Sequence, residues 1–163
     1  WGAAGVYTDT TGRNNIIRCK MAHDTENIYF YAGTAELLTP PTDSAWMRLY
    51  IDADADFKTG WEGFDYLLNR TNPVAGKAML EKNAGGWNWT PVDSIPLRIE
   101  GNRLQGAIPR RLLGDDADKP IDLRFKWADN TQQDGDMLEF TLHGDSAPPG
   151  RFMYRYRTTA DPK

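Results

Sequence analysis

The chain has 163 residues, about the size of one globular domain. Hydrophobic residues make up 40% of it and charged residues 26%, a balance that excludes an intrinsically disordered chain. The formal net charge of -4 argues against a nucleic-acid partner, because phosphate binding requires a clustered excess of Lys and Arg. No apolar run reaches the length of a membrane span, which argues against membrane insertion.

In chain order, about eleven short segments show the alternating or apolar pattern of β-strands, separated by turns rich in Gly, Asn, Asp and Pro. The predicted strands are Ile16–Met21, Ile28–Ala32, Trp46–Ile51, Phe64–Leu68, Ala78–Lys82, Trp87–Thr90, Leu97–Glu100, Leu104–Ile108, Leu123–Trp127, Leu138–Leu142 and Phe152–Tyr156. One helical turn is expected at Arg110–Leu113, after Pro109 and before Gly114. The pattern is typical of a sandwich or a barrel, and we predict a single domain over residues 1–163 that forms a two-sheet antiparallel β-sandwich.

An acidic turn follows the third predicted strand. Asp52, Asp54 and Asp56 are spaced two residues apart there, and the chain turns at Gly60. Such carboxylates suit a hard cation, so they are candidate ligands of a structural Ca²⁺. The segment does not match the helix-flanked calcium loop, because Phe57 stands where that loop requires glycine. The alternative is a plain turn, in which Asp side chains accept hydrogen bonds from their own backbone.

Aromatic residues make up 12% of the chain and include six Trp. A flat indole can pack against the apolar face of a sugar ring, so Trp in a turn is a candidate platform. Trp61 occupies such a turn, and Trp87 and Trp89 share one face of a predicted strand. Trp46 and Trp127 lie in apolar strands and are expected in the core.

Polar residues near these tryptophans in the pattern could contact sugar hydroxyls. The candidates are Asn69, Arg70 and Asn83. Each of them also suits an ordinary turn or surface position. No nucleophile elbow, phosphate loop or metal-binding His motif is present, so catalysis would depend on a pair of carboxylates drawn from Glu62, Asp65 and Glu81.

Several segments together resemble one known family. They are Asp24–Tyr31, Trp46–Asp52, Lys58–Tyr66, Ala107–Arg110 with Leu112–Gly114, and Gly150–Tyr156. On these residues the chain resembles the carbohydrate-binding module family 9-like domains, relatives of the DOMON sandwich, which are found in bacterial secreted glycoside hydrolases. The resemblance implies a jelly-roll-like sandwich and a role beside a catalytic domain, in a secreted, periplasmic or cell-surface protein.

The resemblance also implies a site. Family 9 modules hold a terminal sugar between two Trp side chains and carry metal ions in structural places. Trp61 matches one member of that pair, and the second is Trp87 or Trp89.

The sequence is compatible with three functions. The first is a non-catalytic domain that binds a mono-, oligo- or polysaccharide and has been excised from a multidomain secreted glycoside hydrolase. The second is a structural domain that packs on the neighbouring catalytic domain through exposed aromatic residues and binds no sugar. The third is a small stand-alone glycosidase or lyase.

Overall fold

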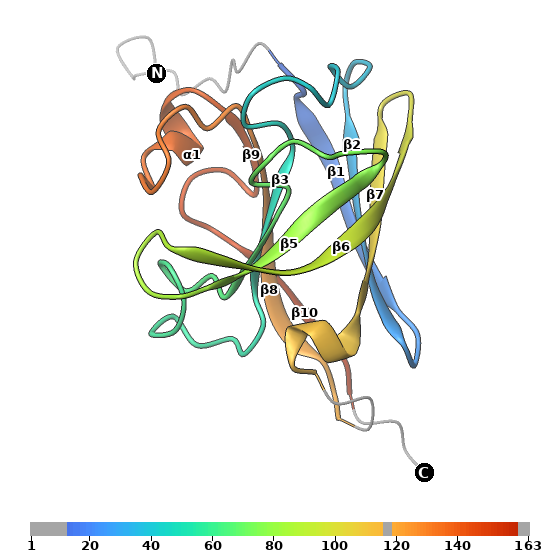
Figure 1. Ribbon diagram of the computed structural model, residues 1–163, viewed down its shortest axis with the longest axis vertical. Coiled ribbons are helices and arrows are strands. Elements are labelled where there is room, and N and C mark those ends of the chain that lie inside the picture. The colour runs from blue at the N-terminus through green and yellow to red at the C-terminus, as the bar shows by residue number, and fades with distance from the viewer. Residues whose placement is uncertain (1–12, 116–118, 160–163) are drawn as a thin grey trace, which may run out of the picture.

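The computed structural model describes residues 13–115 and 119–159, which form an all-β fold, as predicted (Figure 1). Neighbouring strands pair antiparallel throughout. The strands are β1 (Ile16–His23), β2 (Asn27–Thr34), β3 (Arg48–Asp52), β4 (Tyr66–Leu68), β5 (Lys77–Asn83), β6 (Trp89–Glu100), β7 (Arg103–Pro109), β8 (Asp122–Asp129), β9 (Asp145–Ala147) and β10 (Tyr154–Arg157). The helices are η1 (Arg110–Leu113) and α1 (Glu139–Leu142).

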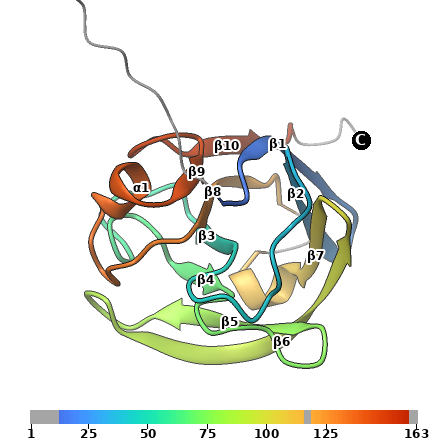
Figure 2. The same ribbon diagram turned by 90° about the horizontal axis from the view of Figure 1, so that it is seen from above.

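The strands form one continuous sheet in the order β1-β2-β7-β6-β5-β4-β3-β8-β10. The short strand β9 pairs with the second half of β8, while β10 pairs with its first half. Seen from above, the sheet curls until it is nearly closed into a barrel (Figure 2).

The predicted two-sheet sandwich is not confirmed, because strand β6 belongs to both halves of the sheet. Its first part pairs with β5 and its last part pairs with β7, so the hydrogen-bonded ladder continues from one half of the molecule to the other. The sequence predicted two strands here, Trp87–Thr90 and Leu97–Glu100. The structure joins this region into one strand of 12 residues that contains Pro91 and Pro96, although proline usually marks the end of a strand.

The two ends of the strand order meet through side chains. The Nδ1 atom of His23 on β1 lies 2.7 Å from the hydroxyl oxygen of Tyr156 on β10. At the other end of β1, the backbone N–H of Ile16 donates a hydrogen bond to the carboxylate of Asp145 on β9. These contacts hold β1 beside the last strands and bring the barrel close to closure (Figure 2).

The main core fills the inside of the barrel. Alternate residues of each strand point into it, such as Leu49 and Ile51 on β3 and Phe30 on β2. Trp46 and Trp127, which the sequence placed in the core, are 0% and 1% exposed. The barrel wall is therefore held together by residues that repeat with a period of two.

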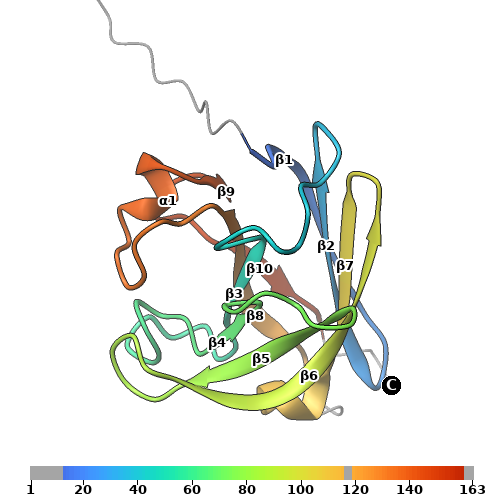
Figure 3. The ribbon, with the colours of Figure 1, turned by 45° about the horizontal axis from the view of Figure 1, so that its top comes forward.

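A second apolar layer covers the outside of the wall that β3, β4 and β8 form. Its buried members are Tyr50, Trp61, Phe64, Leu67, Ala128 and Phe140. Phe140 belongs to α1, which lies beside β9 on the side away from β2 and β7 (Figure 3). The sequence predicted a strand at Leu138–Leu142, and this prediction is wrong. Phe140 packs into the layer while Leu138 and Leu142, four residues apart, share the exposed side of a helical turn.

The other helical prediction is confirmed. Helix η1 covers Arg110–Leu113, and Gly114 ends it with φ 71°, a left-handed conformation that glycine adopts without steric cost. Among residues 13–115 and 119–159, no helix is both long and apolar enough to cross a membrane.

Lys126 on β8 is buried beneath the second apolar layer. Its ammonium group donates hydrogen bonds to the backbone carbonyls of Pro148 and Phe152, and it lies 4.9 Å from the centre of the Phe140 ring. Burial lowers the pKa of Lys126 to about 7, because the charged form is poorly solvated there.

Candidate functional site

The three tryptophans that the sequence singled out lie together. The ring centroids of Trp61 and Trp87 are 4.5 Å apart, and those of Trp87 and Trp89 are 5.4 Å apart, both pairs edge to face. Trp61 also lies against Tyr50 and Phe64 of the second apolar layer. The sequence prediction paired Trp61 with Trp87 or Trp89, and the structure brings all three into one tryptophan cluster.

Trp61 lies at the base of this cluster and is 7% exposed, so its indole has no open face for a sugar ring. The structure therefore does not support Trp61 as an exposed platform. The turn that carries it lies against an apolar wall, and burying the indole there removes a large apolar surface from water. Trp87 and Trp89 are half-buried and reach the surface. Trp87 packs closely on Gly135, where an added Cβ would lie 3.1 Å from the Cγ of the indole.

The three polar residues predicted to contact sugar hydroxyls have partners within the protein. Asn69 is buried and donates a hydrogen bond of 2.6 Å to the carbonyl of Trp46. Arg70 forms a bidentate pair with Glu81, with two N–O distances of 2.8 Å. Asn83 bridges the backbone of the turn that follows β5. All three side chains stabilise the fold in this arrangement.

The acidic turn brings three carboxylates together, but with a different third member. One oxygen each from Asp52, Asp54 and Asp65 lies within 4.8 Å of the others. Asp56 lies outside this group, and its side chain accepts a hydrogen bond from the backbone of Lys58. We call Asp52, Asp54 and Asp65 the acidic corner. Asp65 replaces Asp56 because the strand β4 that follows it pairs with β3, which brings a residue distant in sequence to the turn.

Asp52 shows that the acidic corner fits a cation. Its side chain is 0% exposed and its Oδ1 atom has no hydrogen-bond partner, while Oδ2 accepts from Arg124 at 3.2 Å. Burial raises the pKa of Asp52 to about 6, with Asp65 and Asp54 adding to the effect and Arg124 opposing it. Burial also raises the pKa of Asp65. A hard cation would offset the repulsion and satisfy the free oxygen, so the donor set suits Ca²⁺.

The three carboxylates considered for a glycosidase pair, Glu62, Asp65 and Glu81, lie in different surroundings. Glu81 is buried against Arg70, and Asp65 accepts a hydrogen bond from the backbone of Ala53 at 2.9 Å. Glu62 is exposed in the turn after Trp61. Two of the three candidates therefore have fixed partners within the fold.

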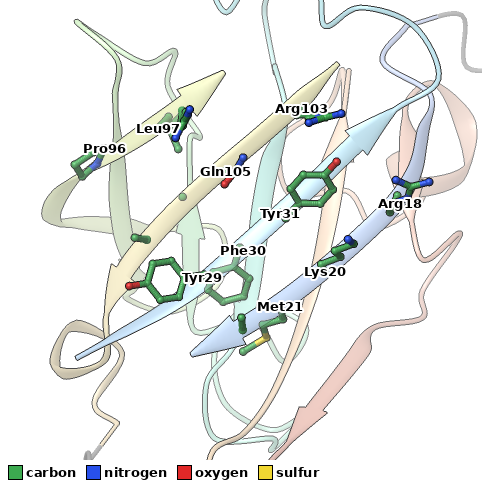
Figure 4. Close-up of a pocket in the computed structure, with 14 residues that line it drawn as sticks. Arg18, Lys20, Met21, Tyr29, Phe30, Tyr31, Pro96, Leu97, Arg103 and Gln105 are labelled. Carbon is green, nitrogen blue, oxygen red and sulfur yellow. The ribbon is translucent and has the colours of Figure 1, made fainter. Parts of the chain in front are cut away.

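A site that the sequence did not predict lies on the outer face of β1, β2, β7 and β6. An open pocket of about 780 Å³ lies there, which is within the size range of small-ligand sites (Figure 4). Strand β2 runs through its centre. Because the side chains of Phe30 and Ala32 point into the core, those of Tyr29 and Tyr31 point outward, and Gly33 lies on the same outer face. We call this the sheet-face pocket.

The register across three strands places the residues of the sheet-face pocket in rows. Tyr29 lies between Ala22 on β1 and Ala107 on β7. In the next row Tyr31 lies between Lys20 and Gln105. The small alanines leave free space on both sides of Tyr29, whose side chain is 39% exposed.

Tyr29 is held in place from one end. Its hydroxyl donates a hydrogen bond of 2.6 Å to Oδ2 of Asp24, and the other oxygen of Asp24 accepts from the backbone N–H groups of Glu26 and Asn27. The turn between β1 and β2 therefore fixes the ring, which reduces the entropy that a ligand would have to overcome.

The sequence contains a partial signal for this site. Tyr29 and Tyr31 alternate with Ile28, Phe30 and Ala32, so they occupy the face of the strand opposite the core. The signal is incomplete because the residues beside them belong to β1 and β7. Comparison of the chain with protein-family models, curated proteins and solved structures found no match, so the resemblance to family 9-like modules stays a prediction.

Proposed function

We propose that this chain is a non-catalytic domain that binds carbohydrate in the sheet-face pocket. The observation that carries the proposal is the exposed ring of Tyr29 between Ala22 and Ala107. A sugar ring has an apolar patch of C–H groups that packs against such an aromatic face. Tyr29 therefore takes the role that the sequence assigned to Trp61.

The adjacent row supplies groups that can contact sugar hydroxyls. Tyr31 has a hydroxyl, Gln105 an amide and Lys20 an ammonium group, and all three line the pocket. Together they offer both donors and acceptors, as the hydroxyl rim of a sugar requires. An aromatic platform beside a row of mixed polar groups supports binding of a saccharide over binding of a purely apolar ligand.

The remaining parts of the proposal follow from the resemblance. The domain acts beside a catalytic domain of a secreted, periplasmic or cell-surface bacterial glycoside hydrolase. The acidic corner holds a structural Ca²⁺ through Asp52, Asp54 and Asp65, and the ion orders the turn that precedes Trp61. The partnered positions of Glu81 and Asp65 support a non-catalytic role.

A second candidate is the domain that packs on a neighbour without binding sugar. Exposed apolar side chains near the second apolar layer favour it, among them Phe57 at 63% and Phe152 at 75% exposure. Leu138 and Leu142 on α1 are also exposed. Exposed apolar side chains of this kind can form a contact with another protein domain. This function uses a different face of the molecule from the sheet-face pocket.

Isothermal titration calorimetry against a panel of neutral and acidic oligosaccharides tests the proposal. We expect saturable binding that Tyr29→Ala abolishes and Tyr29→Phe weakens only modestly, because Phe keeps the ring but loses the hydrogen bond to Asp24. Circular dichroism of each variant shows whether it is folded.

Two outcomes would contradict the proposal. Binding that survives Tyr29→Ala but is lost in Trp87→Ala would move the site to the tryptophan cluster. Absence of binding to every saccharide would leave the packing domain as the better function.

A further inference from the structure

We infer that the sheet-face pocket selects glycans that carry negative charge, as uronic acid carboxylates or as sulfate esters. The inference rests on the proposed function and adds the chemical class of the sugar. It comes from the charges around the two tyrosines.

The lining of the pocket is strongly basic although the chain has a net charge of -4. Arg18, Lys20, Arg98 and Arg103 line it, and no Asp or Glu does so among the described residues. Arg98 is paired with Glu100 at 2.5 Å. In the part of the chain that the structure describes, no carboxylate forms an ion pair with Arg18, Lys20 or Arg103. Three positive charges thus remain available to a ligand.

Arg18 and Arg103 lie on either side of Gly33. They lie in one row of the sheet with Gly33 between them, so the two arginines are separated by two strand spacings, roughly 10 Å at the backbone. Gly33 has no side chain, so the Tyr31 phenol folds over the middle of the row, where a Cβ on Gly33 would lie 3.0 Å from the Tyr31 hydroxyl. The hydroxyl points toward the end of the pocket where the two arginines lie (Figure 4).

This arrangement suits a planar or tetrahedral anion. Guanidinium groups bind carboxylate and sulfate oxygens through pairs of parallel hydrogen bonds, and the Tyr31 hydroxyl adds a donor between them. Lys20 contributes a third charge beside the Tyr31 ring, 5.7 Å from its centre. Like charges on neighbouring strands do not stabilise a sheet. The cluster of Arg18, Lys20 and Arg103 is therefore better explained by ligand binding than by a contribution to folding.

The spacing of the rows indicates an oligosaccharide. The Tyr29 row and the Arg18 row are four residues apart along β2, roughly 13 Å. One sugar ring stacked on Tyr29 does not reach that far. An oligosaccharide can fill the whole pocket if one of its rings stacks on Tyr29 and an acidic group farther along the chain binds Arg18 and Arg103.

The test compares four probes by calorimetry at low and high NaCl. They are a hexameric oligogalacturonide, a heparin hexasaccharide, cellohexaose and an oligothymidylate with the same charge as the oligogalacturonide. The variants are Arg18→Gln, Arg103→Gln and Tyr29→Ala, and the matched control is Arg151→Gln, which removes an exposed charge outside the pocket.

We expect an acidic glycan to bind at least about tenfold more tightly than cellohexaose, with affinity that falls as NaCl rises. Arg18→Gln and Arg103→Gln should each weaken the acidic glycan on the order of tenfold, as for the loss of a charge-assisted hydrogen bond. Both substitutions should weaken the binding of cellohexaose much less than that of the acidic glycan, and Arg151→Gln should change neither. Preference for the galacturonide identifies the carboxylate as the recognised group, whereas preference for heparin, which carries carboxylates and sulfates, shows that sulfate esters contribute to binding.

Other results would overturn the inference. Equal binding of cellohexaose and the acidic glycans, unaffected by the two arginine variants, would refute charge selection and leave carbohydrate binding standing. Binding of the oligothymidylate as tight as that of the glycans would show a general polyanion surface. Absence of binding to all three glycans would refute the inference together with the proposed function.

Discussion

Substitution of Trp61 by alanine tests whether this residue stabilises the fold or binds sugar, as the sequence predicted. Its side chain is 7% exposed and packs edge to face on Trp87. Truncation of a buried Trp to Ala costs about 3–5 kcal/mol, because apolar burial is lost and a cavity remains. Each aromatic pair contributes a further ~0.5–1.5 kcal/mol, but the half-buried Trp87 can move into part of the cavity. We expect the free energy of unfolding to fall by about 3–4 kcal/mol.

Urea unfolding followed by far-ultraviolet circular dichroism measures this loss. Tryptophan fluorescence is unsuitable, because the substitution removes one of the six fluorophores. Tyr31→Ala is the control, since its side chain lies on the outer face of β2. It should change the free energy of unfolding by about 1 kcal/mol or less while weakening sugar binding.

One combination of results would refute this reasoning. If Trp61→Ala lowered the free energy of unfolding by less than about 1 kcal/mol and abolished sugar binding, Trp61 would be an exposed platform. The sheet-face pocket would then have lost its role in the proposed function.

Three further predictions concern the acidic corner and two buried side chains. Added Ca²⁺ should raise the melting temperature in a thermal melt, because the ion binds only the folded state. Asp54→Asn should abolish this increase, whereas Asp56→Asn should retain it. Asn69→Ala should lower the free energy of unfolding by about 2 kcal/mol without changing calorimetric sugar affinity, since a buried hydrogen bond is lost. The pKa of Lys126 is about 7 in the folded protein against 10.5 normally, so the unfolded chain binds more protons above pH 7. Lys126 should therefore make the urea midpoint rise between pH 7 and about 8.5. Lys126→Met should reduce this dependence of the midpoint on pH. The same dependence in the variant would contradict the assignment to Lys126.

The sequence by itself determined the local elements. Alternation of apolar and polar residues, with Gly and Pro in the turns, was sufficient to predict an all-β chain and most of its strands. Pro109 and Gly114 marked both ends of the helical turn. These signals are reliable because the period of a strand and the chemistry of a turn depend on residues adjacent in the chain.

The sequence was less informative where one short segment fits two structures. Leu138–Leu142 has an apolar residue at every second position, as a strand would, yet it forms α1 because Phe140 packs on the outer wall. The strand Asp145–Ala147 has no such pattern and forms only because it pairs with β8. In both cases tertiary contacts outweigh weak local preferences.

Tertiary structure alone decided the site. Trp61 is buried because the wall of β3, β4 and β8 lies behind its turn, and Asp65 replaces Asp56 in the acidic corner because β4 pairs with β3. The sheet-face pocket exists only because β1 and β7 flank β2, which places Arg18 and Arg103 on either side of Gly33. The physical reason is that a strand pattern shows which face of a strand is apolar, whereas the choice of neighbouring strand depends on packing between segments far apart in the chain.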